Sequence, residues 1–147
     1  MSHQQGLSEH ECREHLEPGG VGRVALHTPS GLMIYPVNFT IDGRSIVFRT
    51  TTESTFGYSV VGADVVFETD YVNFGTRQGW SVVVTGTAEA IDDAEAVDQL
   101  RLSGSRPRPF ADGPRTLYVR IPWREITGRA VGDEWLGSAR PATPDVR

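Results

Sequence analysis

Apolar residues recur along this chain mostly in short runs rich in Val, Ile, Phe and Tyr, the composition typical of β-strands. Two of these runs, residues 32–41 and 45–50, are separated by Asp42-Gly43 and therefore predict a β-hairpin. Another turn is expected at residues 28–31, Thr-Pro-Ser-Gly. The expected strands are 21–27, 32–41, 45–50, 64–72, 80–91, 115–123 and 124–131, with the last two forming a closing hairpin.

Helix signals stand in three places. Ser8 and Glu11 form a capping-box pattern, and Leu7 with Cys12 supplies the accompanying hydrophobic staple. Elsewhere a polar residue precedes apolar positions with helical spacing. The helices are expected over residues 8–17, 55–61 and 93–102.

This order of elements predicts a mainly β fold with short α-helices. Six to seven strands joined by tight turns favour an antiparallel barrel, because a sheet that closes on itself has no exposed edges. We expect one domain. It consists of an N-terminal helix and lead-in over residues 1–20, a barrel over 21–131 and a flexible tail over 132–147.

Composition excludes several classes of protein. A formal charge of -5 and a pI near 5.3 argue against broad binding to nucleic acid or to an anionic membrane. All 14 basic residues are arginine, so no lysine is present to form a Schiff base or anchor a phosphate. One cysteine, a polar N-terminus and the lack of a long apolar run predict a soluble, cytoplasmic protein.

The segment 50–55, Thr-Thr-Thr-Glu-Ser-Thr, lies between a predicted strand and a predicted helix start, with Arg49 just before it. Hydroxyl groups, an arginine and the free N–H groups of a helix start are typical of a phosphate site. The same residues also serve as helix caps, which is the more common use of Ser and Thr at this position. Both interpretations remain open from the pattern alone.

A second candidate cluster begins the strand at residue 80. Trp80 and Ser81 follow Arg77, and a Trp at a strand end either lines a pocket for a planar ligand or, more commonly, plugs a barrel. A metal site is not expected, because His10 and His15 lie roughly 140° apart around a helix. A later loop is basic, which suits an anionic ligand or, more commonly, a solvated surface. Its arginines are Arg101, Arg106, Arg108 and Arg115.

No pattern singles out a catalytic acid, base or nucleophile, so the catalytic residues stay unassigned. A pocket with phosphate-binding features and no catalytic side chain fits a site in which a bound cofactor supplies the chemistry.

Five collinear segments resemble the pyridoxamine-phosphate-oxidase-like flavin proteins. The similarity is strongest to the branch of small split-barrel proteins that includes the nitroimidazole-resistance reductases. It implies a six-stranded antiparallel split β-barrel that forms a homodimer, with FMN bound in two grooves at the dimer interface. The segments are VGRVAL, YPVNFTIDGRSIVFRT, VVFETD, GWSVVVTGTA and ITGR, between Val21 and Arg129.

The resemblance also implies the cofactor contacts, which fall in three groups. One strand runs along the isoalloxazine ring, a loop holds the flavin phosphate, and a second strand lies beside the same cofactor. In that order the residues are Pro36, Val37 and Asn38; Arg49, Thr50, Ser54 and Thr55; and Arg77, Trp80 and Ser81. The ITGR segment resembles a strand that approaches the dimer interface.

One departure from the family pattern affects the phosphate loop. Relatives usually end it with Gly, Ser or Thr, and Lys, whereas this chain has Glu53-Ser54-Thr55. Losing one charge-assisted contact costs about 1.5–3 kcal/mol, or roughly one to two decades of affinity, unless Arg49 or Arg77 compensates. A histidine common in nitroimidazole reductases is Arg49 here, so that activity is not carried over.

Three functions are therefore expected. The leading one is an FMN-dependent oxidoreductase that passes hydride or electrons to a small-molecule substrate, which is not expected to be pyridoxamine phosphate. The second is a reductase of the same fold that uses the deazaflavin F420, with the basic loop near its longer tail. The third is a non-catalytic flavin- or haem-binding module.

Overall fold

The computed structural model describes residues 4–92 and 116–132. Its two helices are α1 (Glu9–Leu16) and α2 (Thr55–Val60). Its strands are β1 (Gln4–Gly6), β2 (Gly20–Thr28), β3 (Gly31–Asp42), β4 (Ser45–Thr51), β5 (Asp64–Asn73), β6 (Gln78–Thr87), β7 (Glu89–Ala90), β8 (Thr116–Pro122) and β9 (Glu125–Val131). Within these ranges all strands form one antiparallel sheet in the order β1-β9-β6-β5-β2-β3-β4-β8-β7.

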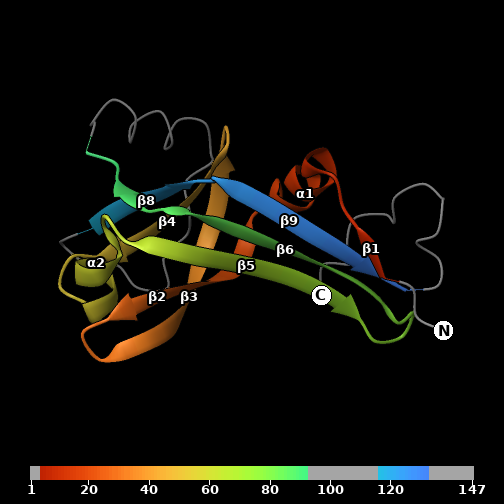
Figure 1. Cartoon of the computed structure of the whole chain (residues 1–147), viewed down its shortest axis with the longest axis horizontal. Helices are drawn as coiled ribbons and strands as arrows, with labels where there is room; N and C mark the ends of the chain where they lie inside the picture. Colours follow the sequence, from red (N-terminus) through yellow and green to blue (C-terminus); the bar gives the residue numbers. More distant parts are fainter. Residues whose placement is uncertain (1–3, 93–115, 133–147) are drawn as a thin grey trace.

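The sheet curls around a core of alternate strand residues, as Figure 1 shows. Phe48 and Phe67 are fully buried, and Phe67 meets Phe39 edge to face with ring centroids 4.9 Å apart. The barrel nearly closes where β6 meets β8, since a side chain at Gly86 would collide with the Pro122 carbonyl oxygen. The predicted mainly β split barrel is thereby confirmed.

Both predicted helices within the described ranges are present. In α1, Ser8 Oγ accepts a hydrogen bond from the Glu11 N–H (3.1 Å), and Glu11 Oε1 accepts one from the Ser8 N–H (3.0 Å). This helix packs on β9, because Gly128 leaves room for the Cys12 sulfur. The helix expected over 93–102, the basic loop after it and the tail beyond Gly132 lie outside the described residues.

Two strand predictions were wrong. The strand expected over residues 80–91 breaks at Ala88, whose N–H donates to the Ala63 carbonyl (2.9 Å) and whose carbonyl accepts from the Gly62 N–H (2.8 Å). The short β7 that follows pairs with β8. The expected closing hairpin does not form, because β8 pairs with β4 and β7 whereas β9 pairs with β6 and β1.

The link between β8 and β9 explains why they separate. The Trp123 N–H donates to the Arg44 carbonyl (3.0 Å), whereas the next N–H, that of Arg124, donates to the Thr85 carbonyl (2.9 Å). Consecutive residues are therefore bound to opposite sides of the barrel seam, and the chain crosses it. The small strand β1, which was not predicted, covers the outer edge of β9. No helix in the described ranges is long and apolar enough to cross a membrane.

Candidate functional site

The predicted ring-contacting strand lies partly at a sheet edge. β3 pairs with β2 from Gly31 to Phe39, but its pairing with β4 covers only the last four residues, from Phe39. Beside Pro36 and Asn38 the second side of β3 therefore has no strand partner among the described residues. Proline suits such an edge because it has no N–H to donate. Val37 is 4% exposed and points into the core, so only its backbone is available to a ligand here.

Arg49 lies on the same outward side of the sheet as Asn38, since Phe39 pairs with Phe48 and alternate residues share a face. Its guanidinium donates to the Tyr118 hydroxyl (3.4 Å) and lies 5.9 Å from the centre of that ring. Thr50 points to the opposite side of β4. The arginine is thus held half-buried at the end of β4, close to the loop that leads to α2.

The hydroxyl of Ser54 serves as the N-cap of α2. Its oxygen accepts a hydrogen bond from the Gly57 N–H (2.9 Å), and its hydrogen is donated to the Thr51 carbonyl (3.1 Å). Gly57 is packed so tightly on that carbonyl that a side chain there would collide with it. Glu53 and Thr55 are exposed on either side of the cap. The capping interpretation of the hydroxyl loop therefore accounts for Ser54.

Arg77, Trp80 and Ser81 come together with further residues around a cavity of about 470 Å³ at the β5–β6 hairpin. The remaining lining residues are Asp70, Val72, Phe74, Gln78, Gly79 and Val131. Sequence reasoning missed Asp70, which pairs with Ser81 across the two strands. Finding it requires the register of β5 against β6, which the sequence alone does not give.

Trp80 is held from behind by α1. Its ring stacks on the His15 imidazole with centroids 4.3 Å apart and planes 22° from parallel. Burial lowers the pKa of His15, which favours the neutral imidazole. The Trp80 Nε1–H is buried and has no hydrogen-bond partner among the described residues. A buried donor without an acceptor is uncommon in proteins. The Trp80 ring lies on the core side of β6 with Val82 and Val84, opposite the side of Ser81 and Asp70, so it supports the cavity from behind.

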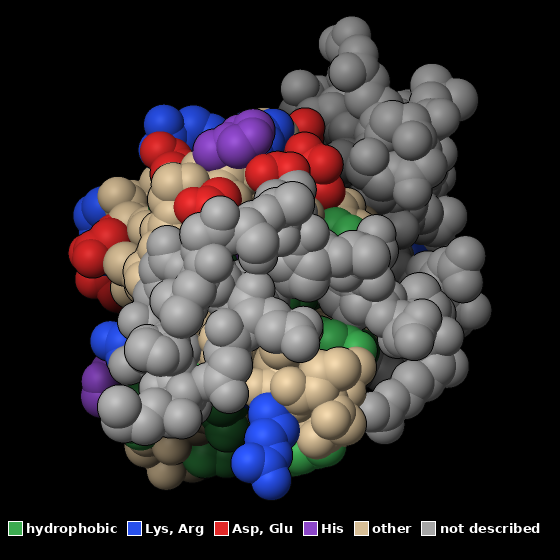
Figure 2. All heavy atoms as spheres, turned by 90° about the vertical axis from the view of Figure 1, so that its right-hand side faces the viewer, with side chains coloured by type: hydrophobic (Ala, Val, Ile, Leu, Met, Phe, Trp, Pro, Cys, Tyr) green, Lys and Arg blue, Asp and Glu red, His purple; other side chains and the backbone are tan. Residues whose placement is uncertain are grey.

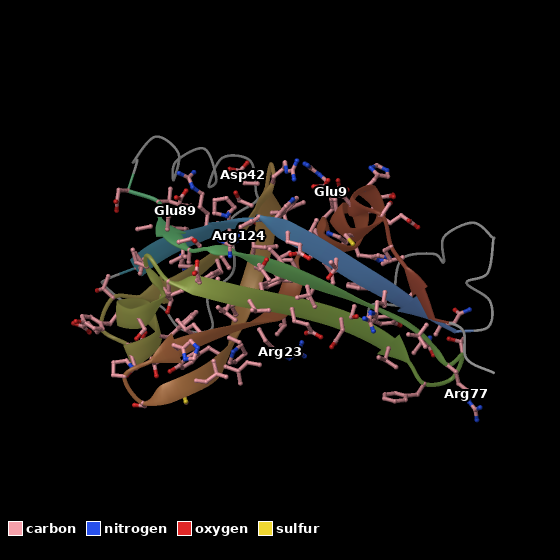
Figure 3. The ribbon with its side chains drawn as sticks, in the orientation of Figure 1. Glu9, Arg23, Asp42, Arg77, Glu89 and Arg124 are labelled. Atoms are coloured by element: carbon pink, nitrogen blue, oxygen red, sulfur yellow. The ribbon has the colours of Figure 1, made fainter. Side chains whose placement is uncertain are left out.

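The two candidate clusters lie at opposite ends of the sheet. Arg77 projects from the tip of the β5–β6 hairpin, at the right of Figure 3, whereas α2 lies at the left of Figure 1 in the same orientation. Seen from the hairpin end, a basic side chain projects at the lower edge beside apolar surface (Figure 2). We refer to Arg49–Thr55 as the cradle and to Arg77, Trp80 and Ser81 with their cavity as the hairpin pocket.

The outer face of the sheet, defined by the residues of β2, β3, β5, β6 and β9 that point away from the core, joins the two clusters. Cross-strand register places most of the large exposed apolar side chains of the described ranges on it. They are Val21, Leu32, Ile34, Val66, Val72 and Val131. Exposed apolar side chains gathered on one face of a sheet mark a candidate interaction site.

A charged group interrupts the outer face. Arg23 Nη1 lies 2.6 Å from Glu68 Oε1 and 3.8 Å from Asp70 Oδ2. Burial, with a hydrogen bond to Asp70 and its negative charge, raises the pKa of Glu68 to about 7 despite the nearby guanidinium. One arginine therefore faces two carboxyl groups, and burial favours the protonated form of one of them, Glu68.

Comparison with known proteins gives the family. The family profile described as pyridoxamine 5'-phosphate oxidase matches residues 8–130. The chain belongs to this family. In agreement, a Corynebacterium glutamicum protein whose name proposes a pyridoxamine 5'-phosphate oxidase is 33% identical, with a TM-score of 0.71 over 88% of this chain and 94% of the other.

Two further structures share the pyridoxamine 5'-phosphate oxidase fold. The FAD-binding protein from Mycobacterium smegmatis is 26% identical, with a TM-score of 0.68 over 87% of this chain and 98% of that one. A Bacteroides thetaiotaomicron protein whose name proposes 5-nitroimidazole resistance is 12% identical, with a TM-score of 0.67 over 90% of each chain, and shows the fold alone.

The uncharacterized protein Rv0080 of Mycobacterium tuberculosis is 37% identical over 82 residues, or 52% of this chain. The match covers 53% of Rv0080, so the chain spans about half the length of this relative. The predicted resemblance to the pyridoxamine 5'-phosphate oxidase family is confirmed by these comparisons together.

Proposed function

We propose that the protein is a homodimeric flavin-dependent oxidoreductase that binds FMN and passes hydride or electrons to a small molecule. Membership of the pyridoxamine 5'-phosphate oxidase family supports this, as does the name of the FAD-binding relative from M. smegmatis. The observation that carries the proposal is that the expected flavin contacts fall into two clusters at opposite ends of the sheet, the cradle and the hairpin pocket. Each cluster alone has only part of these contacts, so a complete flavin site needs two subunits.

A two-fold dimer joined through the outer face would bring the two clusters together. A two-fold axis that lies in the plane of this face, at right angles to the line from the cradle to the hairpin pocket, reverses one chain relative to the other, so the hairpin pocket of each subunit approaches the cradle of its partner. The exposed apolar side chains of the outer face would then be buried, which provides the driving force for association. Each dimer would contain two equivalent flavin sites, each built from both subunits.

The residues present fit a flavin. In the proposed site Arg49 contacts the phosphate, and the free side of β3 at Pro36–Asn38 faces the ring through its backbone groups. In the partner's hairpin pocket Arg77 and Ser81 offer polar groups beside the apolar side chains of Val72 and Val131, which suits a flavin. When bound, the flavin supplies the redox chemistry, while these residues bind it and orient it.

The first test is a titration of the purified protein with FMN, followed by visible absorption, with FAD, F420 and haem as parallel ligands. We expect a flavin spectrum and a Kd in the micromolar range or tighter. We also expect turnover, measured as consumption of a nicotinamide donor when a small-molecule acceptor is present. Binding of F420 but not FMN would support the deazaflavin alternative. Binding of a flavin or haem without turnover would support the non-catalytic module, and binding of none would refute the proposal.

The second test asks whether one site draws on two subunits. Arg49→Ala removes the phosphate contact in the cradle and should weaken FMN binding at least about tenfold. Trp80→Ala removes the ring that packs between the hairpin pocket and α1, and this change should also weaken FMN binding at least about tenfold. After the two variants are mixed and their subunits exchanged, random pairing restores about a quarter of the wild-type sites, all of them in mixed dimers. No recovery, with subunit exchange verified by mass spectrometry, would show that each site lies within one chain.

A further inference from the structure

The cradle carries too little positive charge to neutralise a flavin phosphate. A phosphate monoester carries about −1.5 to −2 charges at neutral pH. The cradle supplies one positive charge, that of Arg49, whose guanidinium already contacts Tyr118. Glu53 adds a negative charge. Thr55, at the end of the loop, is neutral. Within one chain the proposed phosphate site is therefore under-neutralised.

Arg77 is an arginine without an internal role. It is exposed, and within residues 4–92 and 116–132 its guanidinium forms no hydrogen bond or ion pair. The turn that carries it is well built, because Asn73 Oδ1 accepts hydrogen bonds from the N–H groups of Gly75 (2.9 Å) and Thr76 (3.1 Å). The chain thus holds a free cation at the tip of a defined turn.

The backbone of Arg77 adds a second observation. With φ of 57°, Arg77 is the one non-glycine residue in the described ranges with positive φ. A side chain other than Gly, Asn or Asp rarely adopts this conformation, and such strained positions cluster at functional sites. A glycine at position 77 would relieve the strain, yet the chain retains an arginine there that also lines the hairpin pocket.

We infer that Arg77 of each subunit contacts the flavin phosphate in the cradle of the partner subunit and supplies the charge that Thr55 lacks. The inference rests on the proposed two-fold dimer, which places the hairpin tip of one subunit at the α2 end of the other. Arg77 and Arg49 together would then give the phosphate two guanidinium groups, one from each chain. This arrangement makes dimer formation a condition for tight FMN binding.

The test compares FMN with riboflavin, which has the same ring system but no phosphate. Arg77→Gln removes the charge while keeping an unbranched polar side chain, though a shorter one, and it should weaken FMN binding about tenfold to a hundredfold. Riboflavin affinity should stay within about twofold. Thr55→Lys in the same chain restores a cation to the cradle and should recover most of the lost FMN affinity. Arg124→Gln, an exposed arginine away from both clusters, is the matched control and should bind FMN as the wild type does.

Each other outcome is decisive. If the wild type binds FMN and Arg77→Gln binds it equally well, the inference is refuted while the proposed flavoprotein stands. If Arg77→Gln weakens FMN and riboflavin alike, the residue acts on the ring or on the dimer, and the phosphate contact is refuted. Mixing Arg77→Gln with Arg49→Ala should restore sites, and failure to do so would rule out a contact across subunits. A wild type that binds no flavin would refute the proposed function itself.

Discussion

Replacing Ser54 by alanine separates the two interpretations of the hydroxyl loop. In the structure the Ser54 oxygen accepts from the buried Gly57 N–H, and its only hydrogen is donated to the Thr51 carbonyl. A hydroxyl with one hydrogen cannot also donate to a phosphate. We therefore expect Ser54→Ala to destabilise the fold and to change FMN affinity by less than about threefold.

The magnitude follows from the cap. Loss of an N-cap hydroxyl costs about 0.5–2 kcal/mol, and we expect the upper part of this range, about 1–2 kcal/mol, because the Gly57 N–H that loses its acceptor belongs to a buried residue. For a domain of this size this lowers Tm by about 3–6 °C. The assay is thermal and urea unfolding of the flavin-free protein, followed by circular dichroism. Ser54→Asn, which keeps a capping side chain, should recover most of the stability.

The matched control is Thr55→Ala, which removes the neighbouring exposed hydroxyl and should change stability by no more than about 0.5 kcal/mol. The reasoning is refuted if Ser54→Ala unfolds like the wild type while its FMN affinity falls tenfold or more. That result would mean that the hydroxyl turns from Thr51 to the phosphate when the ligand binds.

Two further predictions concern the sheet. The native state holds the Glu68 proton more tightly than the unfolded chain, since its pKa rises from 4.5 to about 7, so this residue costs stability as pH rises through that interval. The stability of Glu68→Gln relative to the wild type should therefore be higher at pH 8 than at pH 5 in urea unfolding, and an equal difference at both would contradict the assignment. Gly86→Ala places a methyl group against the Pro122 carbonyl and should cost about 1–3 kcal/mol, measured by thermal unfolding. Gly6→Ala, where the added group meets open space, serves as its control, and equal Tm values for the two would contradict the close contact at the seam.

Local features of the chain were sufficient to predict much of this fold. The capping box at Ser8 and Glu11, the Asp42-Gly43 turn and the strand-like runs depend on residues close in sequence, and the structure contains the elements they predict. Asp42 and Ser45 pair at the end of the predicted hairpin. These predictions succeed because capping and tight turns are satisfied within a few residues, whatever the rest of the chain does.

Contacts between distant segments could not be predicted in this way. Adjacent strands usually pair, so β8 and β9 were expected to form a hairpin, but the backbone bonds of Trp123 and Arg124 direct them to opposite sides of the seam. The stacking of His15 on Trp80 likewise joins a helix to a strand far along the chain.

The sequence by itself indicated the family, which the profile match over residues 8–130 confirms, and it named the residues that resemble a flavin site. Only the tertiary structure decided how they are grouped. It directs the Val37 side chain into the core, uses the Ser54 hydroxyl as a cap, and sets Arg77 at the opposite end of the sheet from α2. The physical reason is that strand pairing and barrel curvature fix which side chains face outward and at which end. No local pattern of residues carries that information.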